Sequence, residues 1–242
     1  MKYRNVFLYA IITFLFSCSL QSSNPLPSLY AQFYFDKDNQ GWLSSFAFYP
    51  PAEADSFKLS FSFGKFKSSM GDSVFAITQT GYSSNSRLFM YVKRQIEGLH
   101  PNTIYYITVS LGMFAQLIEP YNGDLTVGDQ GAFVKVGAFT QEPINDTIPD
   151  SLNTGQSIVV PEFDVGSAAN DSKDLHYIGR ILPTQPDKLP VLLLGDNSVN
   201  KLTVSSDSGG KVWVLVGVLN NVPIYQRISF STIIIQFQQA SK

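Results

Sequence analysis

The 242-residue chain has one cysteine, Cys18, and two histidines. With no second cysteine, the fold contains no intrachain disulfide. The H-E-x-x-H and G-x-S-x-G signatures of zinc proteases and serine hydrolases are also missing. His100 lies in a turn motif and His176 lies between Leu175 and Tyr177 in a predicted strand. The sequence therefore indicates no catalytic residue, and we expect a non-enzymatic protein.

The chain also has no excess of positive charge, because 17 Lys and Arg residues face 19 Asp and Glu residues for a net charge of -2. Nucleic acids are recognised by clustered cations that neutralise phosphates. We therefore expect no nucleic-acid partner, and no attachment to a membrane by charge alone.

Helical periodicity is scarce as well. No stretch repeats apolar residues at i, i+3, i+4 and i+7 over ten residues between a cap and a stop. Residues 57–64 instead alternate apolar and polar side chains, the pattern of a strand with one buried face. Further runs of β-branched and aromatic residues span 88–92, 104–114, 132–139, 212–219 and 228–237. The sequence predicts a nearly all-β chain, and residues 29–242 are long enough to form one domain with a sizeable core.

The N-terminus has the order of an export signal: Lys2 and Arg4, an apolar run over 6–16, and then Leu15-Phe16-Ser17-Cys18. The run fits a secretory apolar region of about 7–15 residues and is short for a bilayer span of roughly 20. The last four residues resemble the bacterial lipobox. That resemblance implies a signal peptide over 1–17, a lipidated Cys18 carrying palmitate-type chains, and a polar tether over 18–28. A plain signal peptide cut near Ser17 is the alternative.

The lipobox resemblance also implies a place for the protein, which is the bacterial cell envelope with Cys18 in a membrane. Ser19, rather than Asp, follows the cysteine. An outer-membrane location is therefore favoured if the organism sorts lipoproteins by that residue.

Three segments resemble galactose-binding-like jelly-roll domains, which include many bacterial carbohydrate-binding modules. Phe33-Tyr34-Phe35-Asp36 with Gly41-Trp42 resembles their opening, 96–105 contains an L-x-P-N-T-x-Y strand connection, and 212–217 with 228–237 resembles their closing strands. The resemblance implies an antiparallel β-sandwich. The order of elements is similar to uncharacterised bacterial secreted proteins and lipoproteins, which imply no activity.

Two loops place a tyrosine beside small and amide residues. Aromatic faces stack on sugar rings, and amide or charged groups bind hydroxyls. The candidate ligand-binding residues are Tyr82, Asn85, Arg87, Tyr121 and Asn122. Ordinary polar loops with one packed tyrosine each are the alternative. Trp42 and Trp213 lie in apolar strand patterns, so we expect both in the core.

Two acidic stretches, Asp36–Asn39 and Asn170–Asp174, could each supply some of the oxygens that a structural calcium needs. Neither has EF-hand spacing, so solvated acidic turns are the preferred interpretation. The sequence predicts no bound cofactor or metal.

These observations predict a non-enzymatic envelope lipoprotein that binds carbohydrate or another extracytoplasmic ligand through the loops of a jelly-roll domain. The alternative is a structural or protein-interaction lipoprotein, which docks by an exposed strand edge or by the loop-rich segment 116–172. A third hypothesis is a hydrolase with a pair of carboxylates that leaves no sequence signature.

Overall fold

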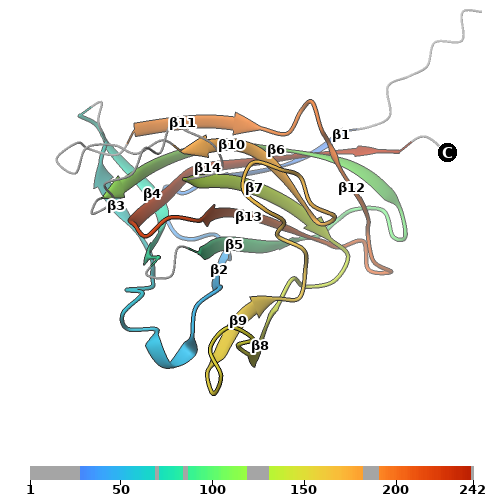
Figure 1. Cartoon of the computed structure of the whole chain (residues 1–242). Helices are drawn as coiled ribbons and strands as arrows, with labels where there is room; N and C mark the ends of the chain where they lie inside the picture. The colour runs from blue at the N-terminus through green and yellow to red at the C-terminus, as the bar shows by residue number, and fades with distance from the viewer. Residues whose placement is uncertain (1–27, 69–70, 84–86, 119–130, 182–190, 241–242) are drawn as a thin grey trace, which may run out of the picture.

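The computed structural model describes residues 28–68, 71–83, 87–118, 131–181 and 191–240. These residues form fourteen β-strands and one short 3-10 helix, η1 (Pro51–Glu53). Twelve of these strands build two antiparallel sheets that pack face to face (Figure 1). The predicted antiparallel β-sandwich is therefore confirmed. Over the same residues, no helix has the length and hydropathy that crossing a bilayer requires.

Sheet A is built around two strands of 15 residues each, β6 and β14. Along one edge, each long strand pairs with two shorter strands in succession. The first half of β14 pairs with β4 and the second half with β1. The first part of β6 pairs with β12 and the later part with β11. The register between β6 and β14 shifts between Phe230 and Thr232. The strands of sheet A are β1 (Ser28–Tyr34), β3 (Ser60–Lys67), β4 (Ser73–Tyr82), β6 (Ile104–Ile118), β11 (Val191–Asp196), β12 (Leu202–Ser205) and β14 (Tyr225–Gln239).

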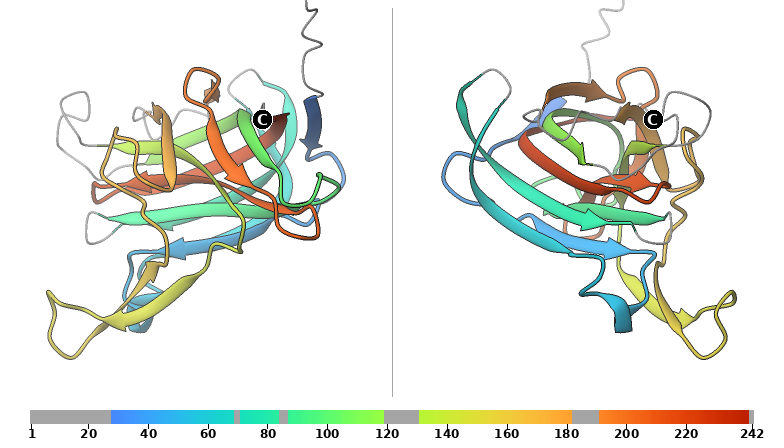
Figure 2. Two further views of the ribbon diagram at one scale, coloured as in Figure 1. Left: turned by 90° about the vertical axis from the view of Figure 1, so that its right-hand side faces the viewer. Right: turned by 60° about the vertical axis from the view of Figure 1, so that its left-hand side comes forward.

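Sheet B has the order β10-β7-β13-β5-β2. Its strands are β2 (Leu43–Ala47), β5 (Leu88–Ile96), β7 (Ala132–Phe139), β10 (Leu175–Ile181) and β13 (Val212–Asn220). A separate two-stranded hairpin, β8 (Asn145–Pro149) and β9 (Ser157–Pro161), projects from the sandwich in all three ribbon views (Figures 1 and 2). The hairpin was not expected, since only 132–139 had a clear strand pattern between residues 116 and 172.

The main core lies between the two sheets and follows the alternation of the strands. In β13, the alternate valines Val212, Val214, Val216 and Val218 are buried in it. Trp42 is also fully buried there, with its ring edge-on to Phe33 at 5.4 Å between centroids. The expectation of a core position is confirmed for Trp42 and is wrong for Trp213, which lies on the opposite parity from the valines and is only half-buried.

The L-x-P-N-T-x-Y connection is structural, as its residues suggest. Leu99 is buried and its backbone N donates to Gly210 O at 3.0 Å. Asn102 adopts a positive φ of 50°. The Tyr105 hydroxyl accepts from the backbone N of His100 at 2.9 Å. His100 is thus part of a turn that closes the end of the sandwich.

A second, smaller core lies on the outer face of sheet B. Residues 140–174 are here called the covering segment; the part that follows the β8–β9 hairpin folds back over this face and packs Phe163 and Val165 against Phe89, Leu175 and Leu215. Lys135 is fully buried beneath the segment, where its ammonium donates to the carbonyls of Ser167 (2.9 Å) and Asn170 (2.8 Å). Burial lowers the pKa of Lys135, and the carboxylates of Asp171 and Asp164 partly oppose this shift.

Candidate functional site

Of the described members of the predicted loop site, Tyr82 lies in sheet A and Arg87 lies just before β5 of sheet B. Tyr82 is the last residue of β4 and pairs with Tyr225 of β14. Like Thr80, two residues earlier, it lies on the outer face of sheet A. The guanidinium carbon of Arg87 lies 3.8 Å from the ring centroid of Phe48, which borders the second core beside sheet B. Asn85, Tyr121 and Asn122 lie outside the described residues. The loop site therefore stays a prediction.

A different surface surrounds Trp213, at the end of sheet B that the covering segment leaves open. Register places Gln95, Trp213 and Phe139 side by side in a row across β5, β13 and β7. With the Gln95 amide oriented to satisfy both of its neighbours, it accepts from Trp213 Nε1 at 3.2 Å and donates to Glu97 Oε1 at 3.2 Å. Lys93 Nζ lies 5.7 Å from the indole centroid. These contacts hold the indole in one orientation while part of it stays exposed.

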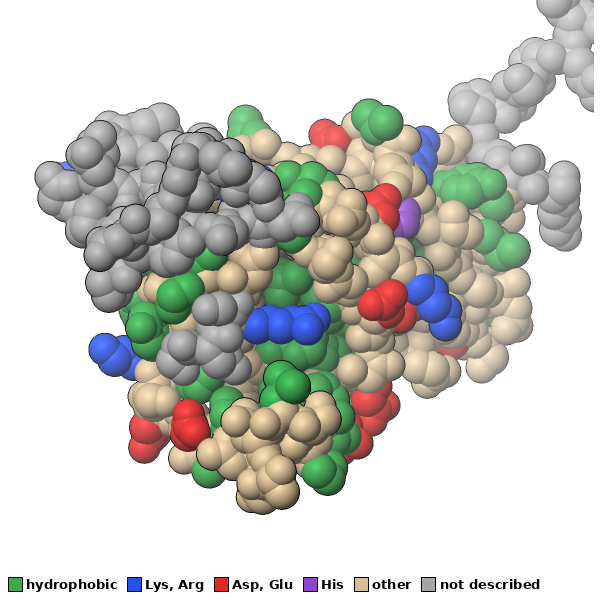
Figure 3. Space-filling model, in the orientation of Figure 1, with side chains coloured by type: hydrophobic (Ala, Val, Ile, Leu, Met, Phe, Trp, Pro, Cys, Tyr) green, Lys and Arg blue, Asp and Glu red, His purple; other side chains and the backbone are tan. Residues whose placement is uncertain are grey.

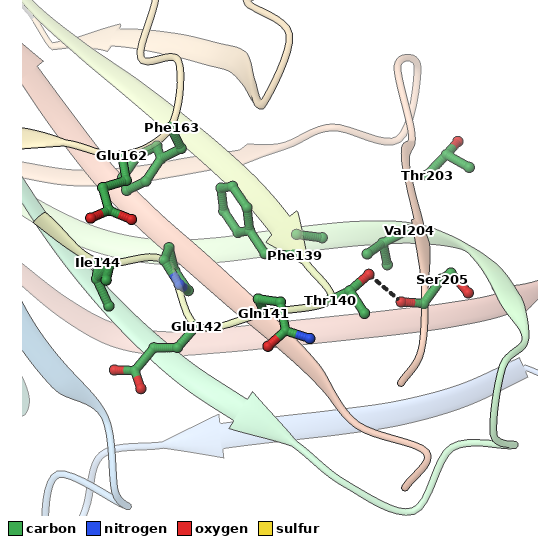
Figure 4. A pocket seen from close by; sticks show the side chains of 12 residues that line it. Phe139, Thr140, Gln141, Glu142, Ile144, Glu162, Phe163, Thr203, Val204 and Ser205 are labelled. Carbon is green, nitrogen blue, oxygen red and sulfur yellow. Dashed lines mark hydrogen bonds between the residues drawn. The ribbon is translucent and has the colours of Figure 1, made fainter. Parts of the chain in front are cut away.

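On one side of this row is a hollow of about 480 Å³, here called the Phe139 hollow. The rings of Phe139 and Phe163 meet there with centroids 5.2 Å apart. Figure 4 shows the two rings next to each other, with Thr203 and Ser205 of β12 on the other side. The Thr140 hydroxyl donates to Ser205 O at 2.7 Å and ties the wall to β12. The polar side chains that line this hollow are Thr140, Gln141, Glu142, Glu162, Thr203 and Ser205.

The acidic groups of the Phe139 hollow differ in their partners. Glu142 Oε1 lies 2.7 Å from Lys93 Nζ, which also donates to Pro143 O at 2.6 Å. Lys93 is buried, so this ion pair fixes the start of the covering segment to β5. Glu162 is exposed, and its carboxylate has no ion-pair partner among the residues that the structure describes. The Phe139 hollow thus has one carboxylate in an ion pair, Glu142, and one carboxylate without an ion pair among the described residues, Glu162.

On the other side of the row is a hollow of about 510 Å³, here called the Arg94 hollow. Trp213 and Gln95 line it together with Glu97, Leu43 and Arg94. The guanidinium carbon of Arg94 lies 4.5 Å from the ring centroid of Phe33. Burial lowers the pKa of Arg94, and the carboxylate of Asp38 partly offsets that shift. Glu97 is held by Lys211, with 2.7 Å between Oε1 and Nζ.

The acidic stretches considered for calcium have other roles in the described chain. Asp38 Oδ1 accepts from Gln40 N at 2.7 Å, and Asp174 Oδ2 accepts from Asp164 N at 2.8 Å. Asp171 accepts from Tyr177 N and from the Asn200 amide. Across the described ranges, no three His, Cys, Asp or Glu side chains are grouped as metal ligands. These carboxylates close turns and connect loops.

Comparison with known proteins gives neither a matching family model nor a matching curated protein. Among solved structures, the chain is similar to the enzymatically active domain of bacteriophage CBA120 tailspike protein 4, at 9% identity and a TM-score of 0.34, covering 83% of this chain and 20% of that one. It is also similar to a mannan-recognising carbohydrate-binding module, at 10% identity and a TM-score of 0.35, covering 89% of this chain and 99% of that one. The winged bean acidic lectin complexed with methyl-α-D-galactose has 12% identity and a TM-score of 0.30, covering 89% of this chain and 100% of the lectin. Likeness at this level identifies no ligand for this chain.

The Trp213 surface was missed at the sequence level although one signal for it is present. The run Val212-Trp213-Val214-Leu215-Val216 places its valines on one parity, so the tryptophan must lie on the other face of its strand. Gln95 of β5 is paired with Trp213, and its amide contacts both the indole and Glu97, which follows the end of β5. The valines of β13 face the main core, whereas Trp213 lies on the opposite face beside the polar residues Gln95 and Glu97. This combination indicates that Trp213 lies at a surface.

Proposed function

We propose that this domain binds carbohydrate at the surface centred on Trp213. The observation that supports the proposal is a half-exposed indole that lines the Arg94 hollow and is paired in register with Phe139, which lines a second open hollow; the two hollows carry amide, hydroxyl and carboxylate groups. An indole packs well against the apolar face of a sugar ring, and the polar groups around it suit the hydroxyls at the ring edge. Two hollows, one lined by Trp213 and the other by its neighbour Phe139, favour an oligosaccharide over a single sugar.

The same geometry favours binding over hydrolysis. Hydrolysis of a glycosidic bond needs a carboxylic acid that can donate a proton and a second carboxylate on the other side of the bond. Glu142 is instead held in an ion pair with Lys93, which suits it to accept hydrogen bonds from hydroxyls. The side chains of the row extend from paired strands, so little conformational entropy is lost when a ligand binds.

A glycan-array screen of the full chain in detergent, followed by calorimetry on any hit, tests the proposal. Trp213→Ala should lower the affinity by at least about tenfold, which corresponds to roughly 1.4 kcal/mol. Tyr106→Ala is the matched control, because Tyr106 is an exposed aromatic on the outer face of sheet A. Absence of binding to every glycan, or equal effects of the two substitutions, would contradict the proposal.

The proposal includes export and a lipid on Cys18, which rest on the sequence pattern alone. Labelled fatty acid should be incorporated into the parent chain and not into Cys18→Ala. Incorporation into both proteins would remove the lipoprotein part of the proposal without affecting the carbohydrate part.

The β8–β9 hairpin favours a second candidate function, docking to another envelope protein. Its tip places Leu152 at 89% exposure, and Ile148 of β8 is 40% exposed. Asp150 fixes the turn, accepting from Leu152 N at 2.8 Å and from the Asn153 amide at 2.7 Å. Crosslinking in cells should then capture a protein partner that is lost with Leu152→Asp while glycan binding is unchanged. No difference between parent and variant would rule out this use of the hairpin.

A further inference from the structure

Arg94 forms no ion pair within 4.0 Å with any residue of the described chain. Its guanidinium stacks on Phe33, and its Nη1 atom is buried with no hydrogen-bond acceptor among the described residues. Gly41 adopts a φ of +73°, and a Cβ at that position would lie 3.3 Å from this nitrogen. The turn before β2 therefore leaves just enough room for the guanidinium, which is fixed between the turn and the Phe33 ring.

The acidic groups near Arg94 are already engaged. Glu97, which lines the same hollow, is paired with Lys211. Asp38 accepts from Gln40 N through Oδ1 and forms no ion pair within 4.0 Å of Arg94. Lys93 and Glu142, on the outer face of the same sheet, neutralise each other. The Arg94 hollow consequently contains a positive charge with no ion-pair partner within 4.0 Å among the described residues, and the carboxylate of Asp38 acts on it only from beyond that distance.

We propose that the Arg94 hollow binds an anionic substituent, a carboxylate or a sulfate ester, on a sugar of the bound glycan. A guanidinium presents a planar set of donors that matches such groups and stays charged at all physiological pH values. Trp213 lines the same hollow, so one ligand can contact both the indole and Arg94. This inference rests on the proposed carbohydrate binding and narrows its ligand class to acidic glycans.

The test compares three ligands on the full chain by calorimetry: oligogalacturonate, the same oligosaccharide with its carboxyl groups reduced to alcohols, and a sulfated galactan oligosaccharide. The parent protein should bind at least one anionic ligand tenfold or more tightly than the reduced one, and this preference should shrink as salt increases. The carboxylate and sulfate ligands distinguish the two sources of negative charge.

Arg94→Gln should abolish the preference for the anionic ligand and leave binding of the reduced ligand nearly unchanged. Arg94→Lys should keep part of the preference, because it retains the charge and loses the planar arrangement of donors. Arg227→Gln is the matched control, since Arg227 is an exposed cation on the outer face of sheet A. Thermal melting of each variant is measured first, and Arg94→Lys replaces Arg94→Gln if the latter unfolds.

The outcomes separate this inference from the proposed function. Equal binding of the acidic and reduced ligands by the parent would overturn the inference while carbohydrate binding stands. A preference for acidic ligands that survives in Arg94→Gln would also overturn it. Absence of binding to every glycan tested here and on the array would overturn both.

Discussion

The outer faces of the two sheets differ in what lies on them. Sheet B has a second core on its outer face, where Leu215 and Phe89 are fully buried beneath the covering segment. Sheet A presents hydroxyl groups that bond to one another across strands, Ser60 to Thr80 at 2.6 Å and Thr78 to Ser229 at 2.8 Å. On the face that Figure 3 shows, charged side chains are scattered, and no area collects one sign.

The difference explains how the candidate site arises. Trp213 and Gln95 come from the sheet, whereas Glu142, Glu162 and Phe163 come from the covering segment. Two residues further along β13, on the same face, Leu215 is fully buried. The candidate site therefore forms at the edge of the covering segment. There the sheet residues are no longer fully buried, and side chains of the segment line one side of the hollow.

The largest effect should come from truncating the second core. Leu215→Ala should lower the free energy of unfolding by about 2–5 kcal/mol, as in a main core, because it removes buried methyl groups and leaves a cavity. Ile234→Ala, at a half-buried position on the outer face of sheet A, should cost clearly less. Urea unfolding of both variants measures the difference. Equal losses of unfolding free energy in the two variants would mean that side chains on the outer face of sheet B are packed no more tightly than those on the outer face of sheet A.

A smaller effect is expected from adding one methyl group to each face. A Cβ at Gly217 would lie 2.6 Å from two ring carbons of Phe89 and 2.8 Å from the Tyr91 Cβ, so Gly217→Ala should cost about 1–3 kcal/mol. A Cβ at Gly64 on sheet A has no neighbour within 4 Å. Gly64→Ala should therefore be neutral or stabilise by up to about 1 kcal/mol, since alanine restricts the unfolded chain. Thermal melting of the pair checks the sign, and a melting loss of similar size in both variants would contradict the contrast.

The sequence predicts the sheets better than it predicts what covers them. Alternation identified β5 and β13, and the L-x-P-N-T-x-Y residues formed the expected connection with Leu99 and Tyr105 buried. The second core was not predictable, because it buries Lys93 and Lys135, two residues that a pattern assigns to solvent. Their burial depends on carbonyls of the covering segment, Pro143 for Lys93 and Ser167 for Lys135, which are distant in sequence. The candidate site depends on the same docking, so its hollows could not be read from local pattern.

The smallest effect tests how the hairpin is joined to sheet B. The Tyr91 hydroxyl donates to Asn145 Oδ1 at 2.8 Å at the start of β8, and burial raises the pKa of Tyr91 to about 12. An unfolded chain releases this proton near pH 10, so the stabilising contribution is complete below about pH 10 and is lost as the pH rises toward 12. Tyr91→Phe should cost about 0.5–1.5 kcal/mol at pH 8 and should flatten this alkaline loss.

Urea unfolding between pH 8 and 11 measures both effects, with Tyr106→Phe on the exposed face of sheet A as the matched control. The control should keep the alkaline slope of the parent, because it leaves the Tyr91 hydroxyl and its hydrogen bond to Asn145 in place. If Tyr91→Phe kept that slope as well, the hydroxyl would be accessible to water in the folded protein. The hairpin would then be joined to the sheet by the Lys93–Glu142 pair and the Asn145 amide, which donates to Phe46 O at 2.8 Å, and not by the Tyr91 hydroxyl.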